Sequence, residues 1–123
     1  VEAFKSIGDT YILYHSDGNI ESIIPDIIEV GVDALHPIQP DCMDPAQIKA
    51  LYGDKITLYG TISVQETLST GNINDIKREV IKRIKYCGKN GGLVLAPAHV
   101  PTPETKVENI VTLYETAKKY RKK

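Results

Sequence analysis

The 123-residue sequence predicts an α/β fold built from four consecutive β-strand–α-helix units. Four short apolar runs, each followed by a stretch with helical period, lead to this prediction. The runs are continuous rather than alternating, which is typical of parallel strands covered on both faces. Repeated strand–helix order favours a parallel sheet with right-handed crossovers, either open and doubly wound or part of a (β/α)8 barrel. The expected strands are 10–14, 33–36, 55–59 and 92–96.

Local capping signals mark the first two expected helices. Pro25 lies within an isoleucine-rich helical pattern, so this helix is expected to begin there and to end at Gly31. In the second helix Asp44 is placed to cap the N-terminus and Pro45 suits the first helical position. Gln47 stands where a capping box needs it.

The third helix is expected to begin near Asn74 or Asp75 and to end at Gly88, after a long loop at 61–72 that would form part of a pocket rim. A basic tail is expected at the end of the fourth helix, where it suits the helix dipole. The residues expected to face the core are Ile48 and Leu51 in the second helix, Ile76, Val80, Ile81 and Ile84 in the third, and Val107, Ile110, Val111, Tyr114 and Ala117 in the fourth; the tail is Lys118, Lys119, Arg121, Lys122 and Lys123.

Composition and the lack of a low-complexity linker indicate one soluble globular domain, 1–123, which we expect to be cytoplasmic; the resemblance described below implies that this domain is partial. The formal net charge of −1 argues against a nucleic-acid binder, and no apolar run approaches the roughly 20 residues that span a bilayer. Cys42 and Cys87 form no CxxC motif and are expected to be reduced thiols. The sequence opens on Val1 rather than Met, so an upstream segment is expected.

All three histidines of the chain follow predicted strands. His15 comes directly after the first strand, His36 ends the second and His99 follows the fourth. Parallel α/β proteins bind ligands beyond the carboxyl ends of their strands. A lone histidine there is usually a packed or hydrogen-bonded residue, but the shared placement of three predicts a site for a small-molecule substrate.

Polar residues continue from the same strand ends, and they are the candidates for contact with that substrate. Dinucleotide and P-loop motifs are absent, as is the histidine motif of one cobalamin-binding family. The candidates are Ser16, Gln39, Gly60 and Ser63, of which Gly60 is expected to permit a close backbone approach or a turn.

Three segments resemble the uroporphyrinogen decarboxylase superfamily, which includes the cobamide-dependent methyltransferases. They are HSDGNIESIIPDIIEVGVDALHPIQP (15–40), YGDKITLYGTISVQETLSTG (52–71) and GGLVLAPAHVPTPETKVENIVTLYE (91–115). The resemblance matches the C-terminal half of the family's (β/α)8 barrel. It implies an N-terminal half, or a second copy of the chain, that completes the barrel and covers its strand edges.

The resemblance to the zinc-dependent methyltransferases implies a metal set of His15, Asp17 and His99, which would also be the catalytic residues. Asp17 stands where the family often has a thiolate, and His99 where it has a later cysteine. Two imidazoles and a carboxylate are zinc ligands. A corrinoid on a partner protein would exchange the methyl group, and the missing thiolate favours donors such as methoxylated compounds over thiols. The resemblance assigns no role to His36, which we expect to pack or to stabilise a turn.

Two alternatives to methyl transfer remain open at this point. Decarboxylation of uroporphyrinogen in tetrapyrrole biosynthesis would use no metal or cofactor, with His99 contacting the substrate. The arginines and aspartate of that activity belong to the family's N-terminal half. The second alternative is a catalytically silent fragment, or a half-barrel that acts only with a partner half.

Overall fold

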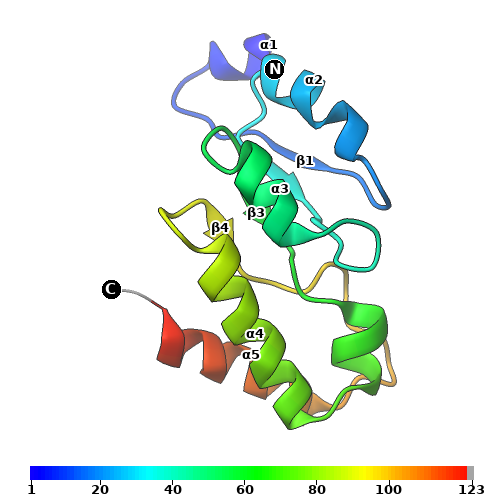
Figure 1. Ribbon diagram of the computed structural model, residues 1–123. Helices are drawn as coiled ribbons and strands as arrows, with labels where there is room; N and C mark the ends of the chain where they lie inside the picture. Colours follow the sequence, from blue (N-terminus) through cyan, green and yellow to red (C-terminus); the bar gives the residue numbers. More distant parts are fainter. Residues whose placement is uncertain (122–123) are drawn as a thin grey trace.

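The computed structural model describes residues 1–121 and contains the predicted alternation of strands and helices (Figure 1). Four parallel strands form one sheet in the order β1-β2-β3-β4. The strands are β1 (Leu13–His15), β2 (Ala34–His36), β3 (Thr57–Tyr59) and β4 (Leu93–Val94).

The helices are α1 (Glu2–Lys5), η1 (Glu21–Ile23), α2 (Ile24–Glu29), α3 (Pro45–Tyr52), η2 (Val64–Leu68), α4 (Ile73–Cys87) and α5 (Val107–Tyr120). The segments η1 and η2 are a 3-10 helix and a π-helix. Within residues 1–121, no helix combines the length and the apolar character needed to cross a bilayer.

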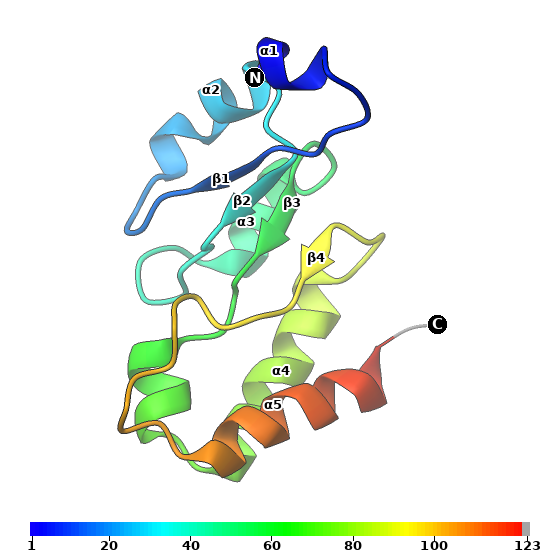
Figure 2. The same ribbon diagram turned by 180° about the vertical axis from the view of Figure 1, so that it is seen from behind.

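The arrangement is that of a half-barrel. Consecutive strands are neighbours, and α2, α3 and α4 lie on one side of the sheet (Figures 1 and 2). A doubly wound sheet would instead carry helices on both faces and reverse its strand order. The predicted fold class, four consecutive βα units of a (β/α)8 barrel, is therefore confirmed.

Only one face of the sheet is covered by helices. Leu35 and Leu58 point to that face and are fully buried. Residues one position away point to the opposite face, because side chains alternate along a strand. On that face Leu13 is 51% exposed and Val94 is 45% exposed. In a complete barrel this face is the packed interior.

The strands are shorter than predicted, although the backbone of Asp33 already pairs on both sides just before β2. Its nitrogen donates to the carbonyl of Ile12 and its carbonyl accepts from the nitrogen of Thr57, each at 2.9 Å. The carboxylate of Asp33 also accepts from the backbone nitrogen of Ile12 at 2.8 Å and pairs with Lys5 at 2.8 Å. Both of these hydrogen bonds lower the pKa of Asp33, and the one from Lys5 lowers it most.

The cap of α3 forms, but two expectations for this helix are wrong. Asp44 accepts from the backbone nitrogen of Ala46 at 2.9 Å. Gln47 does not complete a capping box, because its amide donates to Glu21 at 3.2 Å instead. Leu51 does not face inward and is 52% exposed, whereas Ile48 is fully buried.

The helix α4 begins slightly earlier than expected, with a complete capping box at Asn72. The Asn72 side chain accepts from the backbone nitrogens of Asn74 and Asp75 at 2.8 and 3.1 Å. The Asp75 carboxylate accepts from the Asn72 backbone at 2.9 Å. The preceding loop 61–72, expected to be irregular, contains η2, which Ser63 caps.

The helix α5 is rotated away from the orientation that its apolar pattern predicts. Its buried residues are Asn109, Leu113 and Thr116, whereas Val107 is 70% exposed. The cause is a buried polar anchor, because the Asn109 amide donates to the carbonyls of Leu68 and Gly71, each at 3.0 Å. Val111 and Tyr114 are exposed as well, so the expected stripe is wrong, although Ile110 and Ala117 pack as expected. Lys118 and Lys119 lie in the last turn, and Lys122 and Lys123 lie outside the described residues.

Replacing Asn72 by alanine should lower the free energy of unfolding by about 1 kcal/mol, because two backbone N–H groups of α4 lose their cap. Urea unfolding of the protein measures this loss. Asn74→Ala is the matched control, since the Asn74 side chain lies two residues further on and takes no part in the cap. An equal loss in both variants would contradict the role of the cap.

Candidate functional site

The two histidines that end β1 and β2 lie against each other. The parallel register pairs His15 with His36, and their Nδ1 atoms are 2.8 Å apart. The backbone continues this alignment, because the nitrogen of Ser16 donates to the carbonyl of His36 at 2.9 Å. The Tyr59 ring packs edge-on against His36 with the ring centroids 4.5 Å apart. His36 therefore packs between His15 and Tyr59, in line with the expectation of a packed residue.

The surroundings of His36 favour its neutral form. Burial lowers the pKa of His36 most, and the charges of His15 and His99 lower it further. A backbone hydrogen bond to Pro97 and the charge of Asp17 act in the opposite direction. The half-buried His36 ring therefore favours its neutral form.

His15 and Asp17 form a second close pair, on the other side of the His15 ring. Nε2 of His15 and Oδ2 of Asp17 are 3.4 Å apart, and both side chains are about half exposed. Two ligands each about 2.1 Å from a tetrahedral zinc ion lie about 3.4 Å apart. The pair therefore has the spacing of two ligands of one ion, with the free side open to solvent.

His99 lies beside this pair but does not complete a metal site. His99, Asp17 and Gln39 line one cavity of about 340 Å³. Gln39 itself is held by the backbone nitrogen of Gly18, which donates to its carbonyl oxygen at 3.2 Å. Across residues 1–121, no three His, Cys, Asp or Glu side chains are gathered as the ligands of one ion. The donor types of His15, Asp17 and His99 fit zinc, and the first two also fit in spacing.

Gly60 makes room for His36. Its φ of +71° lies in the left-handed region, and a Cβ there would lie 2.6 Å from Cδ2 of His36 and 3.1 Å from the carbonyl oxygen of Pro97. The sequence predicted a close approach or a turn at this position. The structure shows that the approaching group is the imidazole of His36 together with the chain that follows β4.

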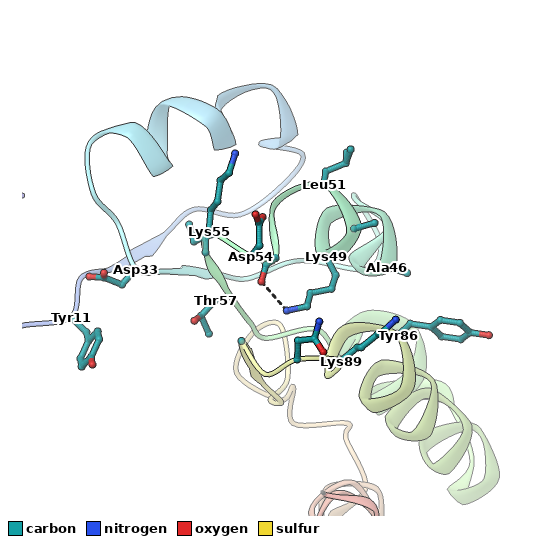
Figure 3. Close-up of a pocket in the computed structure, with 15 residues that line it drawn as sticks. Tyr11, Asp33, Ala46, Lys49, Leu51, Asp54, Lys55, Thr57, Tyr86 and Lys89 are labelled. Atoms are coloured by element: carbon teal, nitrogen blue, oxygen red, sulfur yellow. Dashed lines mark hydrogen bonds between the residues drawn. The ribbon is translucent and has the colours of Figure 1, made fainter.

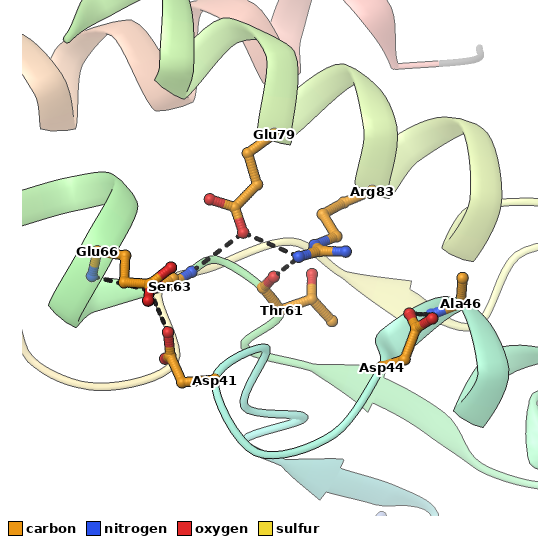
Figure 4. A network of polar contacts seen from close by, with 8 residues as sticks. All are labelled: Asp41, Asp44, Ala46, Thr61, Ser63, Glu66, Glu79 and Arg83. Atoms are coloured by element: carbon orange, nitrogen blue, oxygen red, sulfur yellow. Dashed lines mark hydrogen bonds and ion pairs between the residues drawn. The ribbon is translucent and has the colours of Figure 1, made fainter. Parts of the chain in front are cut away.

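Ser63 belongs to a polar network on the outer side of the strand ends (Figure 4). Its hydroxyl donates to Asp41 at 2.8 Å and accepts from the backbone nitrogen of Glu66 at 3.1 Å. Its backbone nitrogen donates to Glu79 at 3.3 Å. The Ser63 hydroxyl therefore both donates and accepts a hydrogen bond within the protein.

The same network contains a buried ion pair that the sequence reasoning missed. Arg83 pairs with Glu79 at 3.0 Å, and their side chains are 8% and 10% exposed. Arg83 also donates to the carbonyl of Thr61 at 2.9 Å. The signal was present in the helix period, because positions 76, 79, 80 and 83 share one face of α4. Two charged residues on that face indicate a buried pair.

Another cavity, of about 1110 Å³, lies at the opposite ends of the strands (Figure 3). Its wall includes Tyr11 and Thr57, which precede or begin strands. Lys49 crosses one side of it, and its ammonium group donates to the carbonyls of Gly53 and Gly91 at 3.0 and 2.7 Å. In barrels of this kind that end carries stability, whereas the carboxyl ends carry the chemistry.

The structure is therefore a half-barrel that carries imidazoles and a carboxylate at the strand ends, where (β/α)8 barrels place their ligand sites. The uroporphyrinogen decarboxylase (URO-D) family model matches residues 1–120. The chain belongs to this family.

Two curated relatives are both named Methylcobamide:CoM methyltransferase MtaA. The protein from Methanosarcina barkeri is 30% identical over 120 residues, covering 98% of this chain and 34% of the relative. The protein from M. barkeri strain Fusaro is 28% identical with the same coverage. A solved methyltransferase from Methanosarcina mazei superposes with a TM-score of 0.76 at 27% identity, over 97% of this chain and 34% of that one. The chain thus spans about a third of the length of these relatives.

Replacing Arg83 by methionine should destabilise the protein by about 3–5 kcal/mol, because buried Glu79 loses its partner. The midpoint and slope of urea unfolding measure this change. Arg78→Met on the same helix is the control, since Arg78 is 76% exposed and its pair with Asp75 contributes at most about 1 kcal/mol. Similar small losses in both variants would show that the Arg83 pair is not a buried anchor.

Gly60→Ala should cost more stability than Gly91→Ala. Both glycines have positive φ, so both variants carry backbone strain of about 1–3 kcal/mol. Only the Gly60 variant also forces a methyl group into His36, whereas nothing lies within 4 Å of a Cβ at Gly91. The excess should be about 1–3 kcal/mol in urea unfolding and should fall in a His36→Ala background to the part due to the Pro97 carbonyl, which lies 3.1 Å from the added Cβ. An excess that is undiminished there would assign the strain elsewhere.

Proposed function

We propose that the protein transfers a methyl group between a small molecule and a corrinoid carried on a partner protein. The observation that carries the proposal is the paired His15 and Asp17 at the end of β1, with the spacing of two ligands of one ion. The family membership and the printed activity of the two relatives support the reaction class. Because the chain spans about a third of those relatives, this activity belongs to the protein that contains the complete barrel.

The proposed catalytic and metal-binding residues are His15, Asp17 and His99. His99 lines the same cavity as Asp17 and is the third donor on this side of the site. When bound, zinc would supply a Lewis acid that polarises the oxygen or nitrogen carrying the methyl group, or that lowers the pKa of a thiol. Nε2 of His15 and Oδ2 of Asp17 are the atoms that would hold the ion or accept a substrate proton.

The substrate would occupy the cavity in front of these residues. We assign Ser16 and Gln39 as polar contacts, since Ser16 follows His15 directly and Gln39 lines the cavity. Gly60 and Ser63 would affect substrate binding by fixing the shape of the cavity. Gly60 admits the His36 ring, and Ser63 holds the loop that carries Asp41. A carboxylate in place of a thiolate leaves the ion more electron-poor, which suits methoxylated donors better than thiols.

Decarboxylation of uroporphyrinogen is the second candidate, favoured by the family model itself and by the exposed position of His99 on the cavity wall. This reaction would need neither metal nor corrinoid. We further propose that residues 1–123 are one partial domain, completed by an N-terminal half or by a second copy. A chain that is silent alone and active after addition of a partner half would fit that arrangement.

Metal analysis of the full-length protein separates the two activities. We expect one zinc ion per protein, and its loss in His15→Ala and Asp17→Ala, because each variant removes one of the paired donors. Asp26→Asn is the matched control, since Asp26 is exposed on α2 and does not line the cavity that contains Asp17 and His99. Calorimetric titration of the metal-free proteins with zinc compares their affinities for zinc.

The assay is methyl transfer in two separate reactions, from a methoxylated aromatic compound to a free corrinoid in its Co(I) state, or from a free methylated corrinoid to a thiol, each followed by the visible spectrum of the corrinoid. We expect a transfer rate that falls at least a hundredfold in Asp17→Ala and is unchanged in Asp26→Asn. A metal-free protein that decarboxylates uroporphyrinogen and leaves the corrinoid unchanged would refute methyl transfer.

A further inference from the structure

Three hydroxyl groups gather at the wall of the cavity that contains His99. Oγ of Ser69 lies 3.1 Å from Oγ1 of Thr102 and 3.4 Å from Oγ1 of Thr105, and the two threonine oxygens are 3.3 Å apart. Ser69 directly follows η2, whereas both threonines lie in the loop between β4 and α5. Thr105 is buried and the other two residues are half-buried. The cluster therefore joins two loops that follow the neighbouring strands β3 and β4.

The hydrogen of the Ser69 hydroxyl is committed to η2. This hydroxyl donates to the carbonyl of Val64 at 2.6 Å, which is the shortest of its contacts. A hydroxyl has one hydrogen to donate. The Ser69 oxygen can therefore only accept from the threonines, and Thr102, the nearer of the two, is its donor. Ser69 thus connects the backbone of Val64 to the side chain of Thr102.

Both residues that Ser69 connects belong to the cavity wall. Val64 and Thr102 line the cavity of about 340 Å³ together with Asp17 and His99, whereas Ser69 itself does not line it. Val64 begins η2 after β3, and Thr102 lies in the loop after β4. The hydrogen bonds of Ser69 therefore hold two sides of the cavity together from outside it.

His99 lies between two points at which its loop is attached to the segment after β3. Before it, the backbone nitrogen of Ala98 donates to the carbonyl of Ile62 at 2.8 Å. After it, the Thr102 hydroxyl contacts Ser69. Within residues 1–121, the exposed His99 makes no hydrogen bond from its own backbone to another backbone group. The position of His99 therefore depends on these two attachments, and the second is made by side chains.

We propose that Ser69 is a positioning residue that fixes the loop after β4 to η2 and so holds His99 at the cavity. Without its hydroxyl, the loop would remain attached through Ala98 and would lose its attachment at Thr102. The segment between these two residues would then move more freely, because one of its two ends is released. The use of His99 in methyl transfer rests on the proposed function, whereas the attachment of its loop does not.

The motion of the His99 ring in the metal-free, full-length protein tests the proposal. Carbon-13 NMR relaxation gives the order parameter of the ring, which we expect to fall in Ser69→Ala. Thr70→Ala is the matched control, since the Thr70 hydroxyl also donates to a carbonyl of η2, that of Glu66 at 2.6 Å, and is exposed. A ring that is equally ordered in the unaltered protein and in Ser69→Ala overturns the proposal.

Amide hydrogen exchange of the same proteins locates the change. The backbone nitrogen of Thr105 donates to the carbonyl of Thr102 at 2.9 Å, inside the part of the loop that would be released. Its exchange should be about five- to tenfold faster in Ser69→Ala, the change expected for the loss of one hydrogen bond. The exchange of Ala98 should be unchanged. Equal acceleration at both amides would indicate a general loss of stability and would overturn the proposal.

Two variants of Thr102 separate its hydroxyl from its shape. Thr102→Val keeps the branched shape and loses the donor, so it should loosen the His99 ring as Ser69→Ala does. Thr102→Ser keeps the donor and should retain the order of the unaltered protein. The backbone amide spectrum checks that each variant is folded. The opposite ranking, with Thr102→Ser the looser of the two, would assign the effect to packing and overturn the proposal.

Zinc affinity links the attachment to the proposed function and keeps the two apart. Titration of the metal-free proteins should show an affinity about tenfold lower in Ser69→Ala and unchanged in Thr70→Ala, because the third proposed ligand is less well held. If the unaltered protein binds no zinc, the metal-assisted function fails and the NMR measurements still decide the proposal. If zinc binds equally to the unaltered protein and to Ser69→Ala, Ser69 does not position His99 and the proposal is overturned.

Discussion

A parallel sheet needs cover on both of its faces, and residues 1–121 cover only one of them. The other features of the structure follow from this constraint. The helices α2 and α3 bury Leu35 and Leu58, and the opposite face leaves Leu13 and the two strand-end histidines accessible. The relatives are about three times as long as this chain, so they have the residues that can supply the second cover. The site described here is one wall of a cavity whose other wall we assign to the rest of the barrel.

Much of the fold could be predicted because its signals are local. Strand–helix order follows from apolar runs and helical period, and the caps at Asp44 and Asn72 depend on residues two or three positions away. The errors came from contacts distant in sequence. Gln47 bonds to Glu21 rather than to its own helix, and Asn109 sets the rotation of α5 by reaching the loop after η2. The periodicity of a helix does not indicate a hydrogen-bond partner that is distant in sequence.

The candidate site was predictable in outline for a topological reason, since parallel strands bring their carboxyl ends together. The contacts between side chains within the site could not be predicted in the same way. Which imidazole lies against His15 depends on the register of β1 with β2, and the sequence contains no direct signal for register. His99 was the hardest to place, because it follows a two-residue strand through a proline-containing loop. Glu79 and Arg83 were missed because the expected buried face of this helix contained only its apolar residues.

Within residues 1–121, β1 pairs with a single neighbour, β2, and all three of its residues are exposed. A strand held on one side, with little apolar burial, belongs to the part of a protein that opens most easily by local unfolding. His15 is the last residue of that strand, so each opening would separate it from His36 while β2 and β3 remain paired. The order of the site then depends on an edge strand of the sheet, and amide hydrogen exchange in β1 would record how often that strand opens.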